Sequence, residues 1–134
     1  MAEFAHKQLR VYRAAISFVG DANAVAADVP RSRWFISDQL LRAATSILLN
    51  IAEGAGEFSR GDKVRFYRMA RRSDAECAAI VDVMEVMHIL SPERAERLCH
   101  ALGEIAAMLT RMIRNREHRP SPSPSPSPSP SPEH

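Results

Sequence analysis

The chain has 134 residues, in which 18 Lys and Arg face 16 Asp and Glu for a formal net charge of +2. This length predicts one domain, and so small a net charge does not by itself indicate a nucleic-acid or membrane partner. The sequence shows neither an apolar run of about 18 residues nor a charged and then apolar amino-terminal signal, so we expect a cytoplasmic protein without a membrane span.

A first amphipathic helix is predicted over residues 6–27 and ends before Pro30. Apolar residues recur at spacings of three and four, which is typical of a helix with one broad buried face. They form two adjoining stripes, Leu9, Tyr12, Ile16, Val19 and Asn23 in one and Val11, Ala15, Phe18, Ala22 and Val25 in the other.

A second helix is predicted from about Ser32 to Ala52, the least polar stretch of the chain. Its apolar residues fill a wide arc, whereas Leu49 points nearly the opposite way, so we expect contacts on more than one side. The arc consists of Ile36, Leu40, Ala43, Ala44, Ile47, Leu48 and Ile51. Gly54 or Gly56 is expected to end this helix in a left-handed conformation, with Asn50 and Glu53 hydrogen-bonded around the turn.

The last two helices carry clear start signals. Ser59 and Asp62 resemble a capping box that opens a third helix reaching Leu90, and Ser91 followed by Pro92 opens a fourth that ends near Arg116. Their inward residues are Phe66, Ala70, Ser73, Cys77, Ile80, Val81, Met84 and Met87, then Leu98, Leu102, Ile105, Leu109 and Met112.

These elements predict an all-α fold, an up-down-up-down antiparallel four-helix bundle over residues 1–119. Residues 120–134 begin with a strict Pro-Ser alternation. This composition predicts an extended, disordered tail, either a low-complexity extension or a ligand for proline-recognising domains.

The stretch Ser37–Glu76 resembles the signature of the four-helix-bundle proteins encoded by intervening sequences within bacterial 23S ribosomal RNA genes. The matching positions are Gln39, Leu40, Arg42, Ala43, Ala44, Ser46, Asn50, Ile51, Ala52, Glu53, Gly54, Phe66, Ala70, Ser73 and Glu76, and Leu9–Ala15 also fits. One departure is Leu48-Leu49, where the family often has a proline.

The resemblance implies a homo-oligomer, with ring-shaped pentamers known in the family, and no established enzyme activity. It implies structural roles for Gln39, Arg42, Asn50, Glu53 and Gly54. Relatives that accompany diversity-generating retroelements are basic accessory proteins of a reverse transcriptase and its RNA, which gives an expectation of class by analogy.

No residue spacing encodes a reaction. The glycines near Glu53 follow a helix and lack a Gly-Lys-Ser/Thr sequence, so they do not form a phosphate-binding loop. A di-metal site would need two Glu-x-x-His pairs; Glu85 with His88 and Glu3 with His6 have this spacing, but Glu85 projects away from the apolar stripe. We therefore expect no catalytic residue, cofactor, metal or small-molecule substrate, and no disulfide between Cys77 and Cys99.

Basic residues gather in the first half of the third helix and at the end of the fourth. An antiparallel arrangement would bring the two clusters together as a patch suited to nucleic-acid phosphates. Its members are Arg60, Lys63, Arg65, Arg68, Arg71, Arg72, Arg111, Arg114, Arg116 and Arg119. Alternatively, these are solvated side chains bridged to Asp62, Asp74 and Glu76.

The sequence thus favours a non-enzymatic, self-associating scaffold or accessory protein that binds RNA or DNA. The alternatives are a protein-protein adaptor without nucleic-acid contacts and, less favoured, a di-metal carboxylate enzyme.

Overall fold

The computed structural model describes residues 5–118, and within this range all regular elements are helices joined by short turns. The all-α class is therefore confirmed, whereas the tail at 120–134 and the boundary before it lie outside the described residues. The helices are α1 (Arg10–Asp28), α2 (Trp34–Gly56), α3 (Arg60–Val86) and α4 (Pro92–His118), with short 3₁₀ turns η1 (Ala5–Gln8) and η2 (Arg31–Arg33) before α1 and α2.

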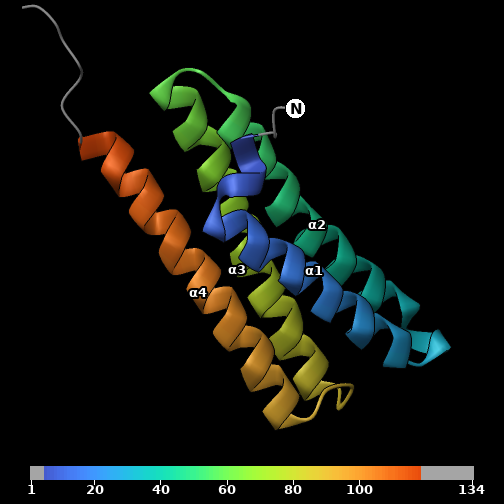
Figure 1. Ribbon diagram of the computed structural model, residues 1–134. Coiled ribbons are helices and arrows are strands. Elements are labelled where there is room, and N and C mark those ends of the chain that lie inside the picture. Colours follow the sequence, from blue (N-terminus) through green and yellow to red (C-terminus); the bar gives the residue numbers. More distant parts are fainter. Residues whose placement is uncertain (1–4, 119–134) are drawn as a thin grey trace, which may run out of the picture.

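Each helix packs against the next one along the chain, and α1 also contacts α4. Figure 1 shows the four helices side by side, with consecutive helices running in alternating directions. The predicted caps are present: the Ser59 hydroxyl accepts from the Asp62 N–H at 3.0 Å, and the Ser91 hydroxyl from the Arg94 N–H at 3.1 Å. Each cap satisfies a backbone donor that a helix start leaves without a partner.

Three helix boundaries differ from the prediction. The second helix continues to Gly56, beyond its predicted end at Ala52. Residues 5–8 form the separate turn η1, so α1 begins at Arg10 rather than at residue 6. The third helix ends at Val86 rather than Leu90, because His88 has a φ of 61° and the Ile89 N–H bonds back to the Met84 carbonyl at 2.8 Å. A left-handed residue cannot continue a right-handed helix.

The core lies between the four helices. Of the two stripes predicted on α1, the one containing Phe18 is buried, while Ile16 of the other is 46% exposed. Leu49 on α2 is 57% exposed, as its position opposite the apolar arc predicted. The largest fully buried side chains are Tyr67, Phe18, Leu40, Ile47, Ile51, Met84, Leu102, Ile105 and Leu109.

Gly54 has a different role from the one predicted. Among the described residues no glycine has a positive φ, and α2 continues through Gly54 to Gly56. A Cβ atom on Gly54 would lie 2.6 Å from Cε1 and 2.9 Å from Cδ1 of Tyr67 on α3. Gly54 is therefore required for the close approach of α2 and α3, and the prediction of a left-handed glycine cap was wrong.

Lys63 caps the end of α2 instead. Its ammonium group donates to the carbonyl oxygens of Gly54 at 3.3 Å and Ala55 at 3.1 Å. These carbonyls belong to the last turn of α2, where the helix has no backbone donors left and carries partial negative charge. A cation from the next helix thus satisfies the end of α2 without a left-handed residue.

Asp74 lies in the core rather than on the surface, so its predicted bridge to surface arginines was wrong. Its side chain is only 4% exposed, and Oδ2 has no hydrogen-bond partner among residues 5–118. Burial disfavours the charged form and raises the pKa of this carboxyl to about 7,. The protein therefore holds a carboxyl in its interior that is protonated below neutral pH.

We predict opposite effects of alanine at the two glycines of the α2 end. Gly54→Ala should lower the free energy of unfolding by about 1–2 kcal/mol, because the clash with buried Tyr67 exceeds the gain in helix propensity. Gly56→Ala meets no atom within 4 Å and should be neutral or raise stability by up to about 1 kcal/mol. Urea unfolding of both variants checks this, and equal effects would contradict the packing role of Gly54.

We also predict that Asp74 makes stability depend on pH. Its folded pKa of about 7 exceeds the unfolded value of about 3.9, so the stability it contributes is present at low pH and lost as the pH rises through 7. Between pH 5 and pH 8 the unfolding free energy of the wild type should fall by about 2–3 kcal/mol relative to Asp74→Asn. Identical pH dependence of chemical unfolding in both proteins would contradict this.

Candidate nucleic-acid interface

The structure brings the start of α3 and the end of α4 together. Arg71 donates to the Thr110 hydroxyl at 3.3 Å, Arg68 forms an ion pair with Glu117, and the Arg116 guanidinium lies 5.3 Å from the ring centre of Tyr67. Figure 1 shows the red end of α4 beside the green start of α3. The two predicted clusters of basic residues therefore adjoin at one end of the molecule.

Some of these cations hold the fold rather than face solvent. Lys63 caps α2, and its pKa is lowered chiefly by burial and then by the nearby charge of Arg116. Arg116 donates to the Met112 carbonyl of its own helix at 3.1 Å, besides lying over Tyr67. Arg71 is half-buried against α4. These three side chains are held in place by contacts within the protein. They are half-buried, and their positive charge adds to that of the exposed arginines nearby.

Other cations are exposed. The side chains of Arg72, Arg111 and Arg114 are exposed, and none of these side chains makes a hydrogen bond or ion pair with another residue of the described range 5–118. Arg68 is exposed beside them and shares its charge with Glu117. We call Arg68, Arg72, Arg111 and Arg114 the basic face.

Helix geometry explains why these residues form one surface. Arg68 and Arg72 are four residues apart on α3, and Arg111 and Arg114 are three apart on α4, spacings that place side chains on the same side of a helix. Arg71 and Thr110 directly precede Arg72 and Arg111 in the sequence. The hydrogen bond between them therefore holds the two helices together close to these arginines. The basic face thus follows the outer seam of α3 and α4.

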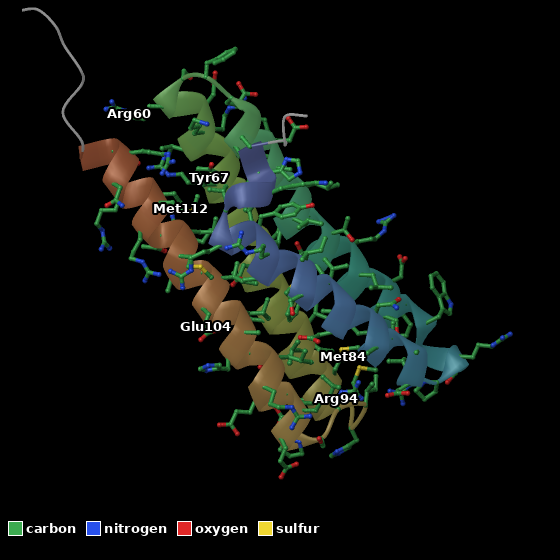
Figure 2. All side chains as sticks on the ribbon, viewed as in Figure 1. Arg60, Tyr67, Met84, Arg94, Glu104 and Met112 are labelled. Atoms are coloured by element: carbon green, nitrogen blue, oxygen red, sulfur yellow. The ribbon has the colours of Figure 1, made fainter. Side chains whose placement is uncertain are left out.

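The remaining predicted positions have individual surroundings. Arg65 lies 4.4 Å above the Phe66 ring and 3.8 Å from the Asp62 carboxylate. Arg60 begins α3 (Figure 2), and Arg119 lies outside the described residues. Of the acidic side chains at this end, Asp62 and Glu117 each face an arginine and Glu57 lies near Lys63, whereas Glu104 lies in the middle of α4 (Figure 2). This end of the molecule therefore keeps an excess of positive charge.

Some polar positions of the predicted family signature lie at the α2–α3 contact. The hydroxyls of Ser46 and Ser73 are 2.8 Å apart, and Asn50 donates to the Ser46 carbonyl at 2.9 Å and to its hydroxyl at 3.2 Å. By contrast, Gln39 and Glu53 are exposed, and Arg42 is exposed and pairs with Asp38 at 3.3 Å. Gly54 therefore lies at the contact of the two helices and Asn50 supports Ser46 from within α2, while the other three lie on the surface.

The described residues offer little for catalysis. Within residues 5–118 no group of three or more His, Cys, Asp or Glu side chains could hold a metal ion. Glu85 is in α3 and His88 follows in the left-handed turn, while Glu3 lies outside the described range. Cys77 and Cys99 are both free thiols. Burial, followed by nearby carboxylates, raises the pKa of Cys77 to about 12 and also raises that of Cys99, which disfavours the nucleophilic thiolate.

No helix between residues 5 and 118 combines the length and the apolar character that crossing a bilayer requires.

One exposed side chain escaped sequence reasoning. Phe58, in the turn between α2 and α3, is 101% exposed. The available signal was a large aromatic residue in a short Gly- and Ser-containing connection, outside any apolar periodicity.

Four helices around one core and an arginine-rich end define a small all-α protein with a basic surface. The chain belongs to the 23S rRNA-intervening sequence protein family, whose model matches residues 7–111, and this confirms the resemblance noted in the sequence. A similar solved structure is a protein of unknown function from the S23 ribosomal protein family of Bacteroides thetaiotaomicron. It shares 22% identity with a TM-score of 0.74, over 78% of this chain and 95% of that chain, which supports the fold alone. No curated protein matches the sequence significantly.

Proposed function

We propose that this protein is a non-enzymatic binding module that contacts the phosphates of RNA or DNA through its basic face. One observation carries the proposal: Arg72, Arg111 and Arg114 are exposed where the start of α3 meets the end of α4, and they have no ion-pair partner among residues 5–118. Arginines that stabilise a bundle make contacts within it, as Arg71 and Arg116 do. Unpaired neighbouring arginines repel one another, and a bound polyanion relieves this repulsion.

The modest net charge of +2 is compatible with this function because the charge is unevenly distributed. A local patch attracts a phosphate backbone even when the rest of the surface is balanced. The competing function, a protein-protein adaptor, does not require the arginines of two helices to converge. An adaptor that bound an acidic protein surface would respond to the same substitutions, so the probe must be the nucleic acid itself.

Reversal of charge on the basic face should strongly weaken nucleic-acid binding without unfolding the protein. We expect Arg72→Glu with Arg111→Glu to weaken binding of a 20-nucleotide RNA by at least about 30-fold at 50 mM salt, because each lost phosphate contact removes a counterion-release contribution. Fluorescence anisotropy measures the affinity, and circular dichroism confirms the helical content.

The matched control is Arg31→Glu with Arg97→Glu, which makes the same change in net charge at exposed positions away from the basic face. Affinity should fall far less in this control. If both double variants lost affinity equally, net charge alone would explain the effect. If the affinity of the variant with Arg72→Glu and Arg111→Glu were unchanged, the proposed function would be contradicted.

We further propose that the protein acts as a homo-oligomer, and that the pentamer implied by the family resemblance is its stoichiometry. A line of apolar side chains on the outer side of α2 and α3 supports this. Phe35 and Leu49 of α2 are 47% and 57% exposed, and Met69 and Val83 of α3 are 42% and 44% exposed. We call these four residues the apolar stripe.

The members of the stripe share one face for geometric reasons. Within each helix the two residues are separated by two seven-residue steps, which return to the same side. Leu49 follows Ser46 by one turn and Met69 precedes Ser73 by one turn, so both flank the serine contact on its solvent side. A depression of about 440 Å³ lined by Leu41, Arg42, Thr45, Ser46, Leu49 and Asn50 lies beside them.

A second copy of the chain suits this surface. An exposed apolar stripe is unfavourable in water and marks an interaction site, and Arg42 and Asp38 supply both signs of charge beside it. Met69 of the stripe lies near Ser73 on the α2 side of α3, whereas Arg68 of the basic face pairs with Glu117 of α4. Assembly through the stripe therefore leaves Arg68, Arg111 and Arg114 open, and several copies bind one polyanion more tightly than one copy does.

Charges placed in the stripe should dissociate the assembly. We expect the wild type to have a multiple of the 14.9 kDa chain mass, five-fold for the pentamer, and Leu49→Glu with Met69→Glu to have the mass of one chain. The physical reason is the cost of burying an unpaired carboxylate in an apolar contact. Light scattering after gel filtration measures the mass.

Ile16→Glu provides the control, since Ile16 is similarly exposed at 46% but lies on α1. This variant should keep the mass of the wild type. A wild type with the mass of a single chain would contradict self-association, and dissociation by Ile16→Glu but not by the stripe variant would assign the contact to another face.

A further inference from the structure

Phe58 is the most exposed of the large apolar side chains at 101%, and the turn around it is well fixed. The Glu57 N–H bonds to the Gly54 carbonyl at 3.2 Å before it, and Ser59 caps α3 directly after it. Lys63 ties the same turn to the end of α2. The backbone on both sides of Phe58 is therefore held in place, and the ring projects into solvent.

Basic residues follow Phe58 along α3, whereas the acidic Glu57 directly precedes it. Arg60 begins α3 two residues later, and the residues between Arg60 and Arg72 rise by about 18 Å along the helix at 1.5 Å per residue. On the same helix Arg65 stacks over the Phe66 ring at 4.4 Å. The end of the molecule thus combines an exposed aromatic ring, an arginine-covered ring and the basic face within a short distance along α3.

This combination distinguishes between forms of nucleic acid. In a duplex the bases are stacked on one another, so a duplex offers phosphates to the basic face but no base for Phe58. In a single strand each base has a free face that stacks on an aromatic side chain while its phosphates follow a basic surface. The exposed ring would be of no use against a duplex backbone.

We infer that this end of the molecule binds unpaired nucleotides, with Phe58 as a stacking platform for one base and the basic face in contact with phosphates further along the same strand. The inference rests on the proposed function and adds the class of nucleic acid: a single-stranded segment or a loop. Because Phe58 touches no core residue by virtue of its complete exposure, its replacement leaves the fold intact, which makes it a clean probe.

The test compares Phe58→Ala, Phe58→Trp and the wild type by anisotropy with a labelled 12-nucleotide single strand and a 12-base-pair duplex at 50 mM salt. We expect Phe58→Ala to weaken single-strand binding by about 5- to 150-fold, the range for loss of one stacked base. Duplex binding should change by less than two-fold, and Phe58→Trp should retain single-strand binding. An abasic strand should bind the wild type and Phe58→Ala equally.

Trp34→Ala is the matched control, because Trp34 is an aromatic residue with 65% exposure at the start of α2, away from the basic face. It should change neither affinity. Single-strand binding that is unaffected by Phe58→Ala, or lowered equally for both probes, would overturn the stacking role while leaving phosphate binding intact. If the wild type binds neither probe, the proposed function fails as well. Loss of oligomer mass in Phe58→Ala would instead make Phe58 a contact between copies and overturn the inference.

Discussion

The close contact of α2 and α3 determines the arrangement on which the rest of the molecule depends. Gly54 leaves room for the buried ring of Tyr67, Ser46 and Ser73 share a hydrogen bond in the middle of the contact, and Lys63 from α3 caps α2. Each interaction joins a residue of one helix to a residue of the other. Together they fix the rotation of α3 about its axis, and hence which of its residues face the core, the solvent and α4.

That rotation gives α3 three surfaces with different properties. One side fills the core, a second contributes Met69 and Val83 to the apolar stripe, and a third contributes Arg68 and Arg72 to the basic face. Self-association and nucleic-acid binding, as proposed, therefore use different residues of the same helix, with Arg68 turned toward α4 and Met69 toward α2. A disturbance of the Gly54 contact would shift both surfaces at once, because both are attached to the same rigid element.

The sequence predicted the features that depend on local pattern. Helical periodicity identified four helices and the exposure of Leu49, and local capping residues identified the Ser59 and Ser91 caps. The order of the helices then placed the two arginine clusters on elements that adjoin in an antiparallel pair. It failed where a contact between helices decides the outcome. Gly54 was predicted to end α2, but the space beside it is set by Tyr67 of the next helix.

The prediction for Asp74 was wrong for the same reason. Charge pattern places an aspartate among arginines on the surface, but the rotation of α3 carries it into the core, where burial raises its pKa to about 7. Phe58 was also missed: its place in a short Gly- and Ser-containing connection was a signal, but the exposure of one aromatic residue depends on how the turn is held. The central claim, that these packing constraints present arginines to phosphate, is tested most directly by the salt dependence of binding. For wild-type protein and a short single strand, the account predicts that log affinity falls linearly with log salt at a slope of about −2 to −4. A slope near zero would contradict it.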